Sequence, residues 1–249
     1  MKLWESRMKS CCYVLLTCIP LLAGATGNDI SKVNGSIHVN AGEIAGDVDT
    51  VNGSIRIEEG ATAAAVETVN GSIQVGDRAT VTTLDSVNGG ISLGGQARAA
   101  SVQTVNGTLK FGEGAQVSGP VSSTNGAILL DKGADVRGKL SNVNGRIVLK
   151  SAHVGGGLET VNGDITLENG SRVEGGILVR KAGFNLFRWT RRPPKIVIGP
   201  NVVVAGPLTF EQEVDLHVSN SAKIGPVSGA KAMPFSGDEP DAAEQKVER

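Results

Sequence analysis

The side chains able to do chemistry in this chain are few and widely spaced. Three histidines, His38, His153 and His217, fall at different positions within the repeats described below, so we do not expect them to converge on a metal ion or a substrate. All three cysteines lie within the first 18 residues, which leaves no thiolate for ligation or catalysis elsewhere. No Ser/His/Asp arrangement and no phosphate-cradling loop is recognisable. We therefore predict no catalytic residue, no metal site and no cofactor, and a protein that is not an enzyme.

Acidic residues recur in one register of the repeat, at Asp49, Glu67 and Asp85, with Glu159 further along. If these positions stack at the spacing of β-strands, about 4.8 Å, neighbouring carboxylates repel each other by about 1 kcal/mol per pair in water. The column is either a site for a cation or a basic partner, or a row of side chains that splay into solvent. We favour the second interpretation.

A column of hydroxyl residues runs beside the acidic one. It consists of Thr50, Thr68, Ser86, Thr104 and Thr160. Threonine columns occur on ice-binding solenoids, but those proteins need broad Thr-x-Thr arrays, and this chain offers one hydroxyl per repeat. We therefore do not expect an ice-binding surface.

A basic and aromatic segment, RKAGFNLFRWTRRPPK at residues 180–195, interrupts the repeat. It contains half of the six aromatic residues that follow the leader, and no acidic residue. Aromatic side chains mixed with arginine on a protruding loop suit contact with anionic lipid, polysaccharide or a partner protein. In the alternative interpretation the aromatic side chains fold back as a cap over the side of the rod. The candidate contact residues are Phe184, Phe187, Arg188, Trp189, Arg191 and Arg192.

All of these residues are positioned by one internal repeat, whose mark is an Asn-Gly pair every 18 or 19 residues. The pairs begin at Asn34, Asn52, Asn70, Asn88, Asn106, Asn125, Asn144 and Asn162. After each pair apolar residues alternate with polar ones, as Ile55 and Ile57 do, which indicates a strand. Two further apolar positions recur in each unit. The sequence therefore predicts an all-β fold, a parallel β-solenoid (β-helix) of about ten three-sided coils of 18–19 residues, of either hand.

The solenoid also explains the Asn-Gly pairs themselves. Equivalent residues of successive coils stack, so the pair occupies one corner throughout. Asparagine and glycine both tolerate the positive φ that a sharp corner demands, and stacked asparagines can hydrogen-bond side chain to side chain. Asn-Gly is also a hairpin signal, but an antiparallel sandwich of hairpins would not need an identical register in every unit.

The two ends of the chain differ from the repeat. Residues 1–25 carry basic residues, a short apolar run and a small-x-small site, which predicts a signal peptide and an exported protein, periplasmic or at the cell surface. Their removal takes three basic and one acidic residue from totals of 24 and 25, leaving 21 and 24, a net charge of about −3. Such a charge gives no basic field for nucleic acid. We assign residues 26–229 to the solenoid and expect residues 230–249 to be a disordered tail.

The units VNGSI, VNGDI and LETVNG behind an export leader resemble the bacterial adhesin repeat family, Gly-rich β-solenoids of the cell envelope. The resemblance covers roughly residues 30–180 and implies a fold more than an activity. The segment IVIGPNVVVAGPL is similar to bactofilins, which are polymer-forming cytoskeletal proteins. Together these features suggest a non-enzymatic envelope scaffold or adhesin-like protein. The alternatives are a bactofilin-like protein that self-associates end to end and, less favoured, a β-helical polysaccharide-active enzyme.

Overall fold

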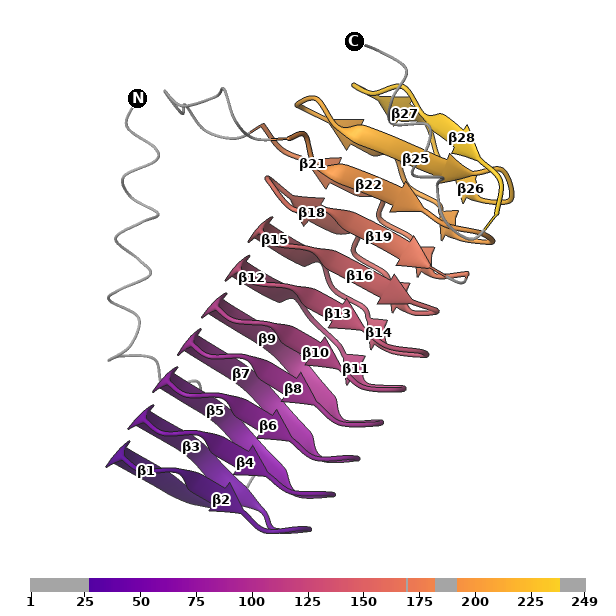
Figure 1. The fold of residues 1–249 in the computed structure, drawn as a ribbon. Helices are drawn as coiled ribbons and strands as arrows, with labels where there is room; N and C mark the ends of the chain where they lie inside the picture. Colours follow the sequence, from indigo (N-terminus) through magenta and orange to yellow (C-terminus); the bar gives the residue numbers. More distant parts are fainter. Residues whose placement is uncertain (1–26, 169, 182–191, 238–249) are drawn as a thin grey trace, which may run out of the picture.

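The computed structural model describes residues 27–168, 170–181 and 192–237. The predicted signal peptide, most of the insertion and residues 238–249 lie outside this part. Every regular element in the described residues is a β-strand, and the strands pair in parallel with their counterparts one coil away. Figure 1 shows the coils stacked into one rod. The predicted parallel β-solenoid is therefore confirmed.

The first side of the rod begins just after the Asn-Gly corner and is an 11-stranded sheet with one strand per coil. Two buried apolar residues flank one outward residue in most of these strands. The strands are β2 (Ile37–Val39), β4 (Ile55–Ile57), β6 (Ile73–Val75), β8 (Ile91–Leu93), β10 (Leu109–Phe111), β13 (Ile128–Leu130), β16 (Ile147–Lys150), β19 (Ile165–Glu168), β22 (Lys195–Ile198), β25 (Asp215–Ser219) and β28 (Met233–Phe235).

The second and third sides belong to one 17-stranded sheet. In the first coils a single long strand covers both sides: β1 (Asn28–Asn34), β3 (Ala45–Asn52), β5 (Thr62–Asn70), β7 (Thr80–Asn88) and β9 (Arg98–Asn106). From residue 116 onward the second side has its own strands: β11 (Gln116–Val117), β14 (Asp135–Val136), β17 (His153–Val154), β20 (Arg172–Val173), β23 (Val203–Val204) and β26 (Lys223–Ile224). The third side then consists of β12 (Val121–Asn125), β15 (Leu140–Asn144), β18 (Leu158–Thr160), β21 (Ile177–Val179), β24 (Leu208–Phe210) and β27 (Val227–Ser228).

The long strand divides where glycine and proline enter the corner between the second and third sides. Both β11 and β12 pair with β9, so the two short strands replace one long one without loss of register. Pro120 has no N–H to donate to the ladder at this point. A Cβ on Gly138 would lie 2.2 Å from the carbonyl oxygen of Gly119, so glycine is required where the coils approach this closely. Separate strands on the second and third sides are thus a property of the later part of the rod.

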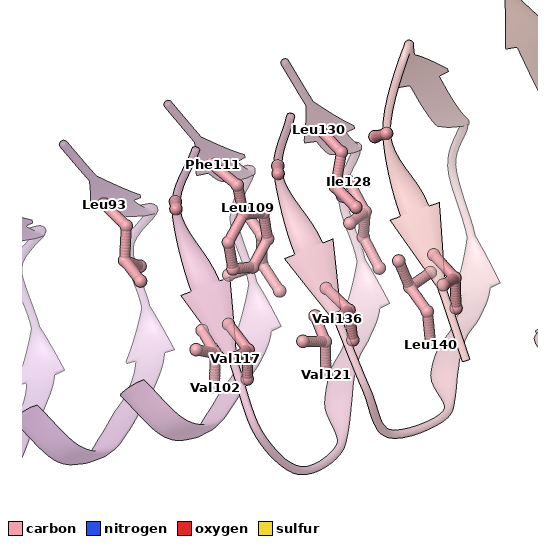
Figure 2. Packing of buried hydrophobic residues seen from close by; sticks show 14 of the residues in the cluster. Leu93, Val102, Leu109, Phe111, Val117, Val121, Ile128, Leu130, Val136 and Leu140 are labelled. Atoms are coloured by element: carbon pink, nitrogen blue, oxygen red, sulfur yellow. The ribbon is translucent and has the colours of Figure 1, made fainter. Parts of the chain in front are cut away.

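The core is a set of stacked aliphatic columns that run the length of the rod. Ile55, Ile73 and Ile91 occupy one column, and Val102, Val121 and Leu140 occupy another. Figure 2 shows inward side chains of the middle coils, among them Val102, Val121 and Leu140, packed between the sides. Phe111 is the largest fully buried side chain. Each coil buries too few apolar groups to be stable alone, so its stability depends on contact with its neighbours.

The solenoid resumes after the insertion and continues past its predicted end. Ile165 pairs with Ile196, which confirms that the repeat restarts at residue 196. The prediction of a disordered tail from residue 230 is wrong for its first part. Met233–Phe235 forms β28, which pairs with β25, and the Phe235 ring is buried. Of the Met-Pro-Phe triplet only Phe235 is buried, and Met233 is 42% exposed, inside a segment whose overall composition is polar.

Most of the left-handed backbone occurs at a different corner from the one that we predict from the sequence, although Gly35, Gly126 and Gly145 of the Asn-Gly pairs do have a positive φ. None of the eight Asn-Gly asparagines has a positive φ. The left-handed residues form a column between the first and second sides, with φ between 48° and 74°. They are Gly42, Gly60, Arg78, Gln96, Gly114, Gly133, Ser151, Gly170 and Asn201. The sharp corner is therefore separate from the Asn-Gly corner.

Candidate functional sites

The asparagines of the Asn-Gly pairs form a continuous hydrogen-bonded ladder, as their spacing predicts. Each Nδ2 donates to the Oδ1 of the asparagine one coil earlier, over 2.9–3.0 Å. The ladder joins Asn34, Asn52, Asn70, Asn88, Asn106, Asn125, Asn144 and Asn162. An amide suits this place because it both donates and accepts. The role of these residues is to hold the coils in register.

From the second pair onward, the closeness of the coils requires the glycine, and Gly35 in the first pair has no atom in the way but a positive φ of 106°. A Cβ on Gly71 would lie 1.9 Å from the carbonyl oxygen of Gly53, and one on Gly89 would lie 1.8 Å from that of Gly71. Real Cβ atoms do not approach backbone this closely, so any other residue would force the coils apart. Close stacking explains the glycine better than positive φ does.

The predicted hydroxyl column points into the rod and serves the same corner. Thr68 is 3% exposed, and its Oγ1 donates to the carbonyl oxygen of Gly53 over 3.0 Å. Thr104 makes the same bond to Gly89, also over 3.0 Å. Beyond Thr160 the column is occupied by Val179 and Phe210. The change to apolar residues coincides with the end of the Asn-Gly pairs, so the hydroxyls are internal caps for the corner carbonyls and not a solvent-facing surface.

The insertion starts on charged contacts with the neighbouring coils. Arg180 donates from Nε to Oε1 of Glu159, and the backbone N–H of Lys181 donates to Oε2 of Glu211 over 3.2 Å. Lys139 also contacts Glu159. Burial by itself would raise the pKa of Glu159, but its hydrogen bonds with Arg180 and Lys139 and their positive charges hold that pKa below its ordinary value. The start of the insertion is therefore anchored to an ionised carboxylate.

The insertion ends on a second carboxylate. Arg192 forms an ion pair with Asp164, and the backbone N–H of Lys195 donates to Asp164 Oδ1 over 2.8 Å. Of the predicted contact residues only Arg192 is described, and it belongs to this anchor. The others, Phe184, Phe187, Arg188, Trp189 and Arg191, lie outside the described residues. Whether they form a contact surface or a cap stays a prediction.

The acidic column faces outward on the third side and is half-buried. Asp49, Glu67 and Asp85 occupy adjacent rungs. Burial, followed by repulsion from Asp85, Asp49 and Asp47, raises the pKa of Glu67, and burial raises the pKa of Asp85. Asp49 accepts a hydrogen bond from Ser31 over 2.6 Å. The side chains are thus more enclosed than in the interpretation that we favour from the sequence.

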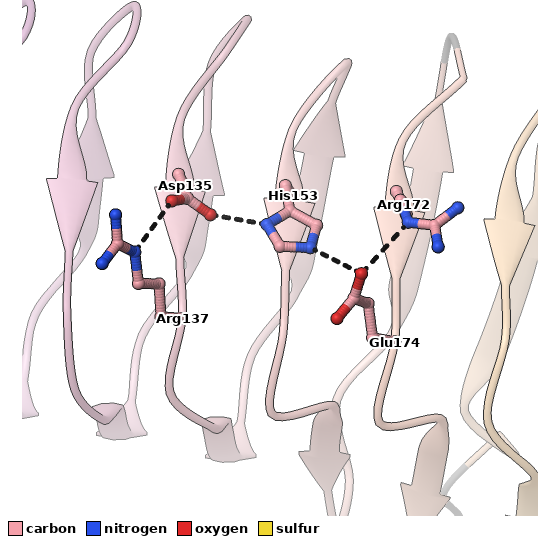
Figure 3. A network of polar contacts seen from close by, with 5 residues as sticks. All are labelled: Asp135, Arg137, His153, Arg172 and Glu174. Carbon is pink, nitrogen blue, oxygen red and sulfur yellow. Dashed lines mark hydrogen bonds and ion pairs between the residues drawn. The ribbon is translucent and has the colours of Figure 1, made fainter.

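A charged network that is not apparent from motifs crosses three coils of the second side (Figure 3). His153 Nδ1 lies 2.5 Å from Asp135 Oδ1, and its Nε2 lies 3.5 Å from Glu174 Oε1. Arg137 and Arg172 extend the network at its two ends. The imidazole therefore lies between two carboxylates that belong to the coils before and after its own. The signal was present in the repeat, since Asp135, His153 and Arg172 share one register.

The histidines do not converge, although two of them share a column. His38 and His217 lie in the same outward register of the first side but at opposite ends of the rod. His153 lies on the second side. Within the described ranges no group of three His, Cys, Asp or Glu side chains is placed to hold a metal ion, and no helix is long and apolar enough to span a membrane.

Two shallow grooves lie on the outer surface of the rod. One, of about 280 Å³ on the third side, is lined by Gln103, Ser122, Ser141, Val143 and Glu159 among others. The second groove has a volume of about 370 Å³ and lies on the second side. Its lining includes the small side chains of Thr82, Ala100 and Ser118, one from each of three successive coils. Neither groove is apparent from the sequence, because each one is formed by side chains from four successive coils.

Comparison with known proteins gives no relative. No protein-family model, curated protein or solved structure matches this chain. The functional argument therefore depends on the residues and geometry described above.

Proposed function

We propose that this chain is a non-enzymatic, exported protein of the bacterial cell envelope, periplasmic or at the cell surface. It works as a rigid scaffold with an adhesin-like binding segment, the insertion at residues 180–195. Its partner is an envelope polysaccharide, an anionic lipid or another protein, and not nucleic acid. The observation that carries the proposal is the anchoring of both ends of a basic-aromatic insertion on a continuous rod.

The anchors support a display role for the insertion. Glu159 holds its first residue and Asp164 holds its last, and both carboxylates belong to ordinary coils. The flanking strands keep their register across the insertion, because β21 pairs with β18 and β22 pairs with β19. A segment tied to fixed points is presented at one place on the rod, which lowers the conformational cost of binding.

The functional groups that could otherwise serve catalysis have structural partners. The hydroxyl column caps corner carbonyls, the asparagines bond to one another, and His153 is held between two carboxylates. These assignments favour a scaffold over a polysaccharide-active enzyme. Turnover of any member of a panel of uronic-acid polymers by the full chain would contradict the proposal.

A binding experiment tests the role of the insertion. The full chain is mixed with beads carrying envelope polysaccharide, with phosphatidylglycerol vesicles, and with a solubilised envelope fraction. We expect capture on at least one of these, and we expect the double variant Trp189→Ala/Arg191→Ala to lose it. Lys110→Ala is the matched control, because Lys110 is an exposed basic residue in β10 on the first side, several coils before both anchors. Unchanged capture of the double variant would reject the contact role, and N-terminal sequencing after export should show cleavage after Ala25.

End-to-end self-association is a second candidate, favoured by the first coil. In the described residues β1 pairs only with β3, and β2 only with β4, so one edge of each has no strand partner. Open strand edges are templates for pairing with another chain. Light scattering across concentration tests this candidate: growth of long species supports it, and a monomer at every concentration removes it.

A further inference from the structure

We propose that the groove on the second side binds a linear anionic glycan, a hydroxylated polymer that carries carboxylate or sulfate groups, between Arg98 and Arg137. The site contains no residue of the insertion, so this inference goes beyond the proposed function and can fail or succeed independently of it. The groove has a volume of about 370 Å³, and its polar lining consists of Thr80, Thr82, Arg98, Gln116, Ser118 and Arg137.

The charge of the groove is opposite to that of the chain as a whole. Its lining includes two arginines and no carboxylate, although acidic residues outnumber basic ones in the whole chain. Asp135 contacts Arg137 over 3.5 Å, but it also lies 2.5 Å from His153, so this carboxylate is shared. The guanidinium of Arg137 is 70% exposed and keeps donors available for a ligand.

Arg98 is set apart by its lack of a partner. Six arginines in the described ranges form ion pairs with carboxylates: Arg56, Arg78, Arg137, Arg172, Arg180 and Arg192. Arg98 and Arg146 are the two arginines in those ranges whose side chains make no hydrogen bond or ion pair. Of these two, only Arg98 lines one of the two grooves. Five guanidinium donors therefore face an open concave surface. A planar guanidinium pairs well with carboxylate or sulfate oxygens.

The floor of the groove suits a sugar chain. Gln116 stacks on Arg98 in the next coil, and Ser118 follows it on the same outward face. The side chains of Thr80, Thr82, Gln116 and Ser118 are exposed and make no hydrogen bond within the described part of the chain. Hydroxyl and amide groups both donate and accept, as glycan hydroxyls do. The small side chains of Ala100 and Ser118 leave the central part of the groove shallow and open.

The length of the groove selects an extended polymer over a single small anion. The coils of Arg98 and Arg137 lie two strand spacings apart, about 10 Å, and the coil of Thr80 adds a third spacing. Two guanidinium groups carried by coils this far apart suit a ligand with more than one charge. A chain with charges at intervals can contact both, while its hydroxyl groups lie over Gln116 and Ser118.

Binding of defined polymers to the immobilised full chain tests the proposal. The probes are polygalacturonate for carboxylates, dextran sulfate for sulfates, and neutral dextran. We expect binding of at least one polyanion and no binding of neutral dextran. Arg98→Ala should weaken the affinity about tenfold and Arg98→Ala/Arg137→Ala about a hundredfold, because each guanidinium loses charge-assisted hydrogen bonds. Binding should also weaken as salt rises.

Matched variants distinguish the groove from charge in general. Arg146→Ala removes the other unpaired arginine and should leave the affinity unchanged. If Arg137→Ala disturbs the fold by freeing Asp135, the single variant Arg98→Gln carries the test alone, since Arg98 has no partner to lose. The proposal is overturned by equal weakening in Arg146→Ala, by unchanged binding in the arginine double variant, or by binding of neither polyanion. Equal affinity for single-stranded DNA or phosphatidylglycerol vesicles would also overturn it, and loss of binding only in Trp189→Ala/Arg191→Ala would assign the ligand to the insertion.

Discussion

Asn106 donates from Nδ2 to Oδ1 of Asn88 over 3.0 Å, and Asn88 donates in the same way to Asn70. Every interior member of the ladder therefore gives one hydrogen bond and receives one. The first member, Asn34, accepts from Asn52 and makes no donor bond within the described residues. The ladder thus has a direction, with its amide donors all turned toward the first coil.

This direction predicts unequal effects for the same substitution. Asn88→Asp removes the donor to Asn70 and should reduce the free energy of unfolding by about 1 kcal/mol, which lowers Tm by about 2–4 °C. Asn34→Asp removes a donor that is not used and should change Tm much less. Thermal unfolding followed by circular dichroism makes the comparison. Equal losses in both variants would show that the ladder bonds do not stabilise the rod.

The glycine columns predict a second contrast. Gly71→Ala places a Cβ 1.9 Å from a backbone oxygen and should cost about 3 kcal/mol or more, since the coils must separate. Gly60→Ala meets nothing within 4 Å and costs only the left-handed backbone at φ 67°, about 1–2 kcal/mol. Urea unfolding of both variants measures the two losses of free energy and shows which one is larger. A larger loss at Gly60 would contradict the close stacking of the Asn-Gly corner.

Asn142 replaces the hydroxyl residue in the inward column, and one of its atoms is unsatisfied. Its Nδ2 donates to the carbonyl oxygen of Gly126 over 2.9 Å, but its Oδ1 is buried without a hydrogen-bond partner among the described residues. Asn142→Thr should keep the bond to Gly126 and remove the buried acceptor, which stabilises the protein by about 1 kcal/mol. A rise in Tm is expected. The control Thr68→Val loses its bond to Gly53 and should lower Tm.

The raised pKa of Glu67 in the acidic column predicts that this residue lowers the free energy of unfolding as pH rises. The folded-state pKa of Glu67 is raised, mainly by burial, so the folded protein binds the proton more tightly than the unfolded chain. The destabilisation is absent below the ordinary carboxyl pKa and complete above the raised one. Glu67→Gln should therefore increase Tm at pH 7 and leave it nearly unchanged at pH 4. A loss of stability in this variant at pH 7 would indicate a favourable partner for the carboxylate.

The lowered pKa of Glu159 predicts the opposite pH dependence of the free energy of unfolding. Its lowered pKa means that the ionised carboxylate stabilises the fold above the ordinary pKa, and that this stabilisation is lost as pH falls through the lowered value. Glu159→Gln should cost about 2 kcal/mol at pH 7, because Arg180 and Lys139 lose a charged partner. Limited proteolysis should also cut the insertion faster. Equal proteolysis of the variant and the parent would show that this anchor does not order the segment.

The repeat made most of the fold predictable. An exact spacing of Asn-Gly pairs fixes which residues stack, and period-two alternation fixes which of them point inward. For that reason the ladder and the restart of the coil at residue 196 follow from the sequence. The Asn-Gly corner was placed correctly, but the reason given for it, positive φ, holds only for Gly35, Gly126 and Gly145 and for none of the asparagines, because φ angles are not visible in the pattern. The left-handed column was not recognisable from the sequence, because two of its positions are occupied by Arg78 and Gln96 instead of glycine.

The candidate sites were less predictable because they depend on relations across coils. Asp135, His153 and Glu174 belong to three coils, and each residue taken separately is an ordinary exposed polar residue. The groove beside Arg98 results from small side chains in its own coil and in the next one, Ala100 and Ser118. The insertion was recognisable as a break in period, yet its partners Glu159 and Asp164 belong to earlier coils that look regular. Aligning the units by register, column by column, is the step that brings such neighbours together.

The one-way ladder also bears on how the molecule is made and how its length can change. A ribosome releases the first coil first, and each later coil finds acceptors already in place on the one before it, so assembly can follow synthesis. The residues from one interior asparagine to the residue before the next, such as 70–87, form one complete coil. Removing such a coil in frame would rejoin two equivalent corners and shorten the rod by one strand spacing, about 4.8 Å, without disturbing the surface at either end.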